Sequence, residues 1–95
     1  MTQENNIQQD IERAARILLE EGAQEVFVFG SARLGTGRPD SDIDLAVRGL
    51  PPERFYHAGG RVMMAVSRPV DLIDLDDHNE FTEYLEKEGE LKRVA

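Results

Sequence analysis

Two aspartates lie one residue apart in the stretch FGSARLGTGRPDSDIDLAV, which spans residues 29–47. They stand in an apolar run that predicts a strand, and alternate side chains of a strand share one face. Asp42 and Asp44 are therefore expected to project the same way, about 6.5–7 Å apart along the backbone. The alternative is that both face solvent on a one-sided sheet, with Ile43 and Leu45 in the core.

Two ionised carboxylates on one face repel each other and are costly to desolvate, and a cation relieves both effects. Aspartate oxygens suit Mg²⁺, which binds through one or two carboxylates and completes its shell with water and substrate phosphate. Two such ions about 3.5–4 Å apart can stabilise the attacking and the leaving oxygen of an in-line displacement at phosphorus. Asp42 and Asp44 are therefore candidate metal ligands and catalytic residues.

A glycine–serine pair precedes the aspartates and predicts a phosphate-binding turn. Gly30 has no Cβ, so the backbone can approach a ligand closely there. The N–H groups that follow attract phosphate if they open a helical turn, and Ser31 adds a hydroxyl donor. Residues 31–40 predict a loop, because they contain two glycines and a proline. The candidate nucleotide-binding residues are Gly30, Ser31, Arg33, Arg38 and Ser41; plain solvent exposure is the alternative for the two arginines.

A third carboxylate would complete such a site, and the next predicted strand offers two. Asp71 and Asp74 are three residues apart, so they face opposite sides of that strand. One of them can join Asp42 and Asp44, and the residues alone do not decide which. A plain surface position is the alternative for Asp71.

The elements around these residues alternate between helical and strand patterns. Apolar spacing predicts an amphipathic first helix, and an Asp77–Glu80 capping box predicts the start of the last one, with Phe81, Tyr84 and Leu85 as its apolar face. Gly59-Gly60 predicts an interruption of the middle helix. The predicted helices are 6–21, 53–67 and about 79–88, and the predicted strands are 25–29, 42–47 and 70–75. This order predicts one α/β (α+β) domain over 1–95, with helices packed on a small mixed sheet of about three to four strands.

Size and charge limit what this domain can bind. The chain has 95 residues and a formal net charge of −8, which leaves no basic face for the phosphates of long nucleic acid. A basic protein partner, or a small anionic ligand accompanied by metal ions, is easier to accommodate. There is no cysteine, no secretory signal pattern and no membrane-length apolar run, so we expect a cytoplasmic protein without a membrane partner.

Gly30-Ser31, then ten residues, then Asp42-Ile43-Asp44 resembles the GS-x10-DxD signature of the DNA polymerase beta-type nucleotidyltransferase superfamily. Nearly the whole chain looks like the minimal, MntA/MNT-type members. The resemblance implies the nucleotidyltransferase fold and places the third catalytic carboxylate at Asp71. It also implies that Asp42 and Asp44 bridge two Mg²⁺ ions, and that Asp71 joins the ion that activates an acceptor hydroxyl. That hydroxyl would attack the α-phosphorus of ATP, and pyrophosphate would leave.

The resemblance also implies a partner. Minimal members are typically antitoxins paired with an all-helical HEPN-domain ribonuclease toxin, which they neutralise by adenylylating a tyrosine, by binding it, or by both. An acidic domain fits a basic, RNA-binding toxin. Two other functions stay open from the sequence. One is a nucleotide-binding interaction module without turnover, and the other is a small-molecule adenylyltransferase that works as a homo-oligomer.

Overall fold

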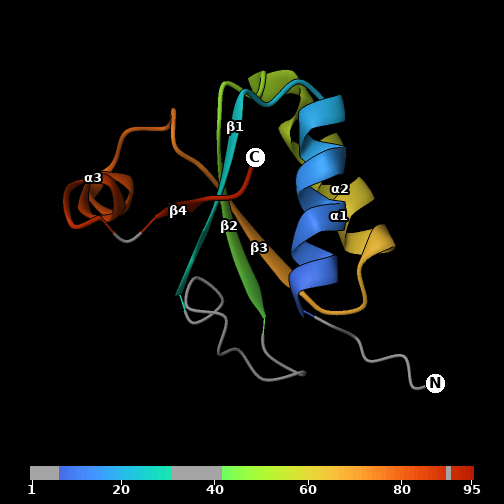
Figure 1. Cartoon of the computed structure of the whole chain (residues 1–95). Helices are drawn as coiled ribbons and strands as arrows, with labels where there is room; N and C mark the ends of the chain where they lie inside the picture. Colours follow the sequence, from blue (N-terminus) through green and yellow to red (C-terminus); the bar gives the residue numbers. More distant parts are fainter. Residues whose placement is uncertain (1–6, 31–41, 90) are drawn as a thin grey trace.

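Helices and strands alternate along the chain and assemble into a sheet with helices on both faces (Figure 1). The computed structural model describes residues 7–30, 42–89 and 91–95. Within these ranges the elements are α1 (Ile7–Glu20), β1 (Glu25–Phe29), β2 (Ile43–Arg48), the 3₁₀ turn η2 (Pro52–Arg54), α2 (Phe55–Ala65), β3 (Val70–Asp74), α3 (Glu80–Lys87) and β4 (Lys92–Arg93). The predicted fold class and the predicted order of elements are confirmed. In the described part of the chain, no helix is long and apolar enough to cross a membrane.

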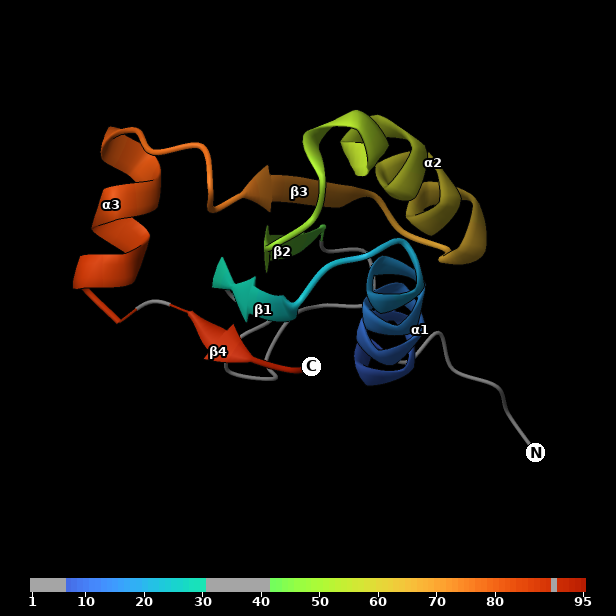
Figure 2. The same ribbon diagram turned by 90° about the horizontal axis from the view of Figure 1, so that it is seen from above.

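The sheet is mixed, with the strand order β3-β2-β1-β4. β1 pairs antiparallel with β2 and with β4, whereas β2 and β3 run parallel. Helices α1 and α2 cover one face and α3 lies on the other, as the view from above shows (Figure 2). The sequence did not predict β4, because its two residues are a lysine and an arginine, which give no apolar pattern. β3 is an edge strand, with one side of its backbone unpaired by the sheet.

Two apolar cores fill the spaces between the sheet and the helices. Alternate residues of β2 divide between them, so that Ile43, Leu45 and Val47 face α1 and α2, whereas Ala46 faces α3. The larger core includes Leu18 of α1 and Val62 of α2. The smaller core consists of Phe29, Ala46, Leu75 and Leu85, with Phe27, Ile73 and Leu91 packed against it. The smaller core has fewer buried residues than the larger one, so α3 packs against only part of its face of the sheet.

The middle helix is continuous, so the interruption predicted at Gly59-Gly60 is wrong. α2 runs through both glycines from Phe55 to Ala65, after the 3₁₀ turn that begins at Pro52. A Cβ on Gly59 would lie 3.7 Å from Leu72 of β3, in ordinary contact. The helix is held by packing against the sheet, which outweighs the weak helical propensity of glycine.

The N-cap of the last helix lies two residues later than predicted, although the helix itself, predicted at about 79–88, spans Glu80–Lys87. Asn79, not Asp77, is the N-cap: its side chain accepts a 3.0 Å hydrogen bond from the Thr82 backbone N–H, and its own N–H donates to the Thr82 hydroxyl at 3.0 Å. The capping box predicted for Asp77 and Glu80 is therefore wrong, but a capping box does begin this helix, formed by Asn79 and Thr82.

The apolar face predicted for this helix is wrong for two of its three residues. Leu85 is buried, but Phe81 is 47% exposed and Tyr84 is 54% exposed. Thr82 is the second buried residue of this helix. Its hydroxyl can be buried because it accepts from the Asn79 N–H and donates to the Asp77 carbonyl. The helix therefore presents two aromatic rings beyond the core.

A buried ion pair fixes the segment that leads into β3. Asp10 of α1 and Arg68 are 4% and 5% exposed, and the Arg68 Nε donates to the Asp10 carboxylate at 3.0 Å. The Ser67 hydroxyl lies 3.3 Å from the same oxygen. The carbonyl of Pro69, the next residue, accepts from the Ile43 N–H at 2.9 Å, which starts the parallel pairing of β3 with β2. No local sequence pattern predicts this pair, because its members lie 58 residues apart.

Arg68→Ala should lower the free energy of unfolding by about 3–5 kcal/mol, because it leaves the Asp10 carboxylate buried without its partner. Urea denaturation followed by circular dichroism measures this loss. Arg13→Ala is the matched control: Arg13 is 55% exposed and 4.0 Å from the same carboxylate, so its loss should cost at most about 1 kcal/mol. Equal losses in the two variants would contradict a structural role for the buried pair.

Candidate active site

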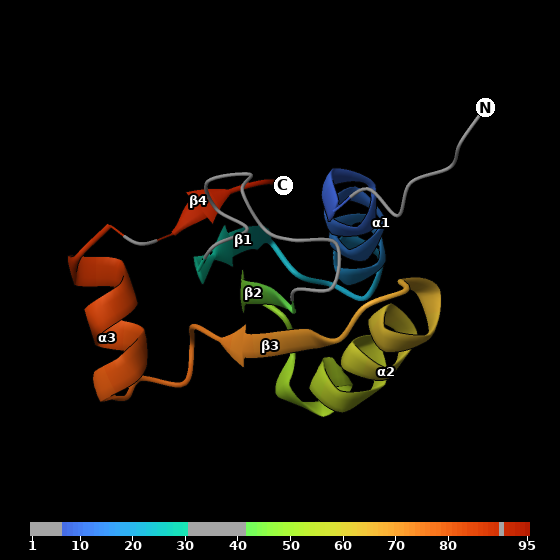
Figure 3. The same ribbon diagram turned by 90° about the horizontal axis from the view of Figure 1, so that it is seen from below.

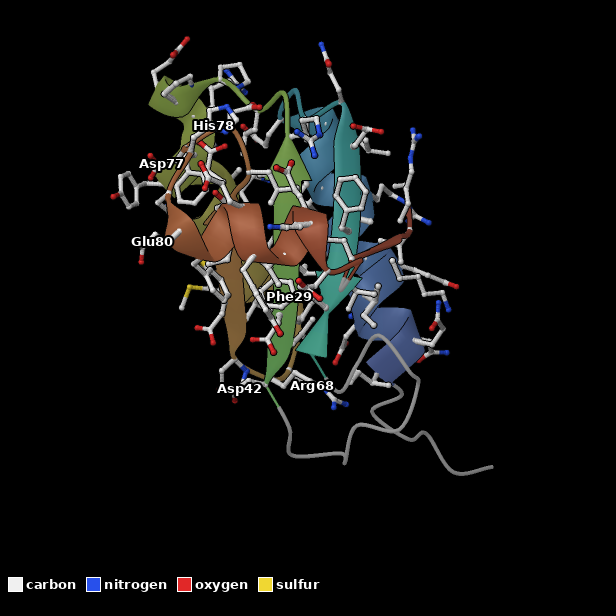
Figure 4. The ribbon with its side chains drawn as sticks, turned by 90° about the vertical axis from the view of Figure 1, so that its left-hand side faces the viewer. Phe29, Asp42, Arg68, Asp77, His78 and Glu80 are labelled. Carbon is white, nitrogen blue, oxygen red and sulfur yellow. The ribbon has the colours of Figure 1, made fainter. Side chains whose placement is uncertain are left out.

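A row of three side chains crosses the sheet on the face that carries α3. Phe29 of β1 pairs with Asp44 of β2, and Asp44 pairs with Asp71 of β3. Asp44 alternates with Ile43 and Leu45, which are buried against the opposite helices, so its carboxylate faces the α3 side. Figure 4 views this face, with Phe29 close below α3 and Asp42 at the start of β2.

The two aspartates of the row are electrostatically unfavourable for each other. Burial raises the pKa of Asp44 above its usual value, and the charge of Asp71, a hydrogen bond with Asp71, and the charge of Asp42 raise it further. None of the ion pairs between described residues includes Asp44 or Asp71. This arrangement concentrates negative charge that a bound cation would stabilise.

Gly30 brings the backbone directly beside Asp44. A Cβ at this position would lie 2.5 Å from the Asp44 Oδ2 atom, and the φ angle of Gly30 is +71°. Glycine is thus required both by the turn and by the contact with the carboxylate. The sequence predicted a close approach of Gly30 to a ligand; the structure adds a close approach to a catalytic candidate.

The alternative between Asp71 and Asp74 has a geometric answer. Asp71 is the residue in register with Asp44, whereas Asp74 is in register with Val47. The Asp74 carboxylate accepts a 2.9 Å hydrogen bond from the Asp76 N–H in the turn after β3. Of the two, Asp71 is therefore the one that stands beside Asp44, and Asp74 stabilises the turn.

Asp42 stands apart from the closest pair. It is exposed, just before β2, and its charge contributes least of the influences on Asp44. Among the residues that the structure describes, no three His, Cys, Asp or Glu side chains converge closely enough to hold a metal ion together. Asp44 and Asp71, with Asp42 just before β2, offer carboxylate oxygens, which are hard ligands of the kind that Mg²⁺ prefers.

The other predicted phosphate-binding residues lie outside the described ranges. These are Ser31, Arg33, Arg38 and Ser41. Their contacts with nucleotide, and the loop predicted over 31–40, stay predictions.

Two aromatic residues near the row were not candidates from the sequence. Phe81 of α3 packs edge-to-face on Phe29, with 6.0 Å between the ring centroids. The sequence predicted Phe29 as part of the strand 25–29 and Phe81 as part of the apolar face of the last helix. The available signal was the position of Phe29 directly before Gly30, which puts its ring next to the turn.

Comparison with known proteins identifies the family of the chain. Residues 11–94 match the family model described as "Nucleotidyltransferase domain". The comparison with curated proteins found no significant match.

Several solved structures share the fold, and the predicted resemblance to MntA/MNT-type proteins is confirmed for the fold. The chain is 25% identical to a toxin–antitoxin structure with AMP-PNP, with a TM-score of 0.64, covering 90% of this chain and 69% of that one. The complex of a tri-AMPylated Shewanella oneidensis HEPN toxin with its MNT antitoxin gives 22% identity, a TM-score of 0.65 and the same coverage. The MntA–HepT toxin–antitoxin complex gives 21% identity, a TM-score of 0.64 and the same coverage.

Gly30→Ala should destabilise the fold more than Gly89→Ala, although both glycines have φ near +70°. Alanine in this region costs about 1–2 kcal/mol by itself. A Cβ at Gly89 meets nothing within 4 Å, whereas at Gly30 it meets the Asp44 carboxylate. The difference between the two urea denaturation curves isolates that contact, and identical curves would contradict it.

Asp44→Asn should stabilise the protein at pH 7 in the absence of divalent cations, while it abolishes any function of the carboxylate. The raised pKa means that the folded state holds the proton more tightly than the unfolded state. Wild-type stability therefore falls as pH rises above 3.8, the ordinary value, and the deficit persists at neutral pH.

The gain should disappear well below pH 3.8, where Asp44 is protonated in both states. Melting temperatures of the wild type and the variant across pH measure this, with Asp77→Asn on the exposed turn as control. A variant less stable than wild type at pH 7 would show that Asp44 is not under repulsion.

Proposed function

The chain belongs to the nucleotidyltransferase domain family, and we propose that it transfers AMP from ATP to a hydroxyl group of a HEPN-domain toxin, which it thereby neutralises. One observation carries the proposal: Asp44 and Asp71 stand side by side on neighbouring strands, immediately next to the glycine that ends β1. The acceptor class comes from the similar complexes, one of which holds a tri-AMPylated HEPN toxin.

The two aspartates of the row, together with Asp42 and Gly30, have distinct roles in this reaction. Asp44 and Asp71, with Asp42, would hold Mg²⁺, which neutralises charge on the triphosphate and on the leaving pyrophosphate when bound. Gly30 leaves room for the triphosphate beside the carboxylates. Asp71, on the edge strand β3, takes the proton of the acceptor hydroxyl. The acceptor oxygen forms a bond to the α-phosphorus, the bond from that phosphorus to the bridging oxygen of the β-phosphate breaks, and pyrophosphate leaves.

The leading acceptor is a tyrosine hydroxyl of the toxin, with ATP as the AMP donor. One similar structure contains AMP-PNP, an ATP analogue, which fits this donor. The strongly acidic surface of the chain, with its net charge of −8, favours association with a basic partner.

A second candidate function is binding of the toxin without turnover. A specific observation favours it: the three candidate carboxylates do not converge as a set among the described residues. In that case nucleotide binding would serve assembly of the complex, and Asp44 and Asp71 would be dispensable for neutralisation.

Incubation with Mg²⁺, α-labelled ATP and the HEPN partner should transfer label to the partner. Asp44→Asn and Asp71→Asn should each reduce the rate by about a hundredfold or more, because each removes one charge from the cation-binding row. Chelation of divalent cations should stop the transfer.

Glu12→Gln is the control, since it removes an exposed carboxylate from α1, on the face of the sheet opposite to the catalytic candidates. It should keep a rate close to that of the wild type. An unlabelled toxin that all four proteins still inhibit would favour the binding-only function.

A further inference from the structure

A groove runs along the free edge of β3, between α2 and α3. It has a volume of about 630 Å³ and is lined by apolar residues, among them Tyr56, Ile73 and Phe81, and by the acidic turn after β3. A second, mostly apolar hollow of about 270 Å³ continues it along α2 and shares Phe55, Tyr56 and Leu72 with it. We call the two together the β3-edge groove. Figure 3 shows β3 on the outside of the sheet between the two helices.

We propose that the β3-edge groove is the acceptor subsite of the domain, and that it binds a basic segment of the HEPN toxin with an apolar or aromatic anchor next to the acceptor hydroxyl. This inference rests on the proposed function and adds to it the surface on which the acceptor docks.

The groove borders the row formed by Phe29, Asp44 and Asp71. Ile73, which lines it, lies two residues beyond Asp71 on the same face of β3, about 7 Å along the strand. Phe81 lines the groove and also contacts Phe29, the other end of the row. A segment that lies in the groove can therefore place an acceptor hydroxyl beside Asp71.

The chemistry of the groove defines its occupant. Its floor is apolar, and Tyr56 and Phe81 expose 87% and 47% of their surface beside it. Aromatic rings exposed around a hollow are the residues that most often dominate binding energy at protein interfaces. Asp74, Asp76 and Asp77 line the same groove. A partner segment with an apolar anchor and flanking Lys or Arg residues satisfies both the floor and the acidic rim, whereas an acidic segment or a bare triphosphate does not.

The acidic rim has one carboxylate free for a partner. The side chain of Asp76 accepts from the Gly49 N–H at 2.8 Å, and that of Asp74 from the Asp76 N–H. No hydrogen bond or ion pair of the Asp77 side chain is formed with another described residue. Asp77 is therefore the position where a change of charge reaches the partner without disturbing the turn.

The test compares two groove variants with two matched controls. Tyr56→Ala removes an aromatic ring from the groove, and Met64→Ala removes an even more exposed apolar side chain, 90% exposed, that lies outside it. Asp77→Lys reverses a charge on the rim, and Glu88→Lys reverses one at the far end of α3. Titration calorimetry with the purified, unmodified HEPN protein measures toxin affinity, and titration with AMP-PNP measures nucleotide affinity.

Tyr56→Ala and Asp77→Lys should each weaken toxin binding by about tenfold or more and leave AMP-PNP affinity unchanged. Met64→Ala and Glu88→Lys should stay within about twofold of the wild type. Added salt should weaken toxin binding by the wild type more than binding by Asp77→Lys, because one attractive charge has already been removed from the variant.

Three results separate this inference from the proposed function. Groove variants that bind toxin like the wild type, while label transfer proceeds, overturn the subsite and leave the function intact. Groove variants that lose AMP-PNP affinity instead show that the groove holds the nucleotide, and this result also overturns the acceptor subsite. Loss of toxin binding in the groove variants, with no transfer by the wild type, confirms the docking surface and refutes the proposed transfer.

Discussion

The repulsion between Asp44 and Asp71 is the constraint on which the arrangement of this domain depends. Parallel pairing of β2 and β3 sets the two carboxylates in register, and the partial burial of Asp44 keeps water from screening their interaction fully. Such a contact costs stability in the folded protein. The rest of the fold must hold it in place: the buried Asp10–Arg68 pair anchors the start of β3, and the apolar faces of β2 and β3 bind the sheet to α1 and α2.

Division of the sheet into two faces separates stability from chemistry. The α1–α2 face carries the larger core, with Leu18, Ile43 and Leu45 fully buried. The α3 face carries a small core that includes Phe29, and it leaves Asp44 partly exposed and Asp71 exposed. Because α3 is short and packs mainly through Leu85 and Thr82, it exposes the aromatic rings that border the row. The part of the molecule that contributes least to packing is thus the part available to ligands.

Patterns that act over a few residues were predictable, and contacts between distant segments were not. The run 42–47 predicted β2, and Gly30 was predicted as a position of close approach, because both depend on local backbone and burial. Asn79 and Asp77 both precede a helix with a suitable residue three positions later, so the cap could not be chosen from the sequence. β4 forms through backbone bonds to β1, and its Arg93 pairs with Glu25 at 3.1 Å, neither of which leaves a pattern.

The edge position of β3 has a thermodynamic consequence for the site. An edge strand is held by hydrogen bonds on one side alone and opens at lower cost than a central strand. Asp71 belongs to that strand, so any fraying of the edge separates it from Asp44 and relieves their mutual repulsion. A cation held by both carboxylates would reverse the balance. Pairing of β3 with the sheet and binding of a cation between Asp44 and Asp71 would therefore be coupled, so that each favours the other.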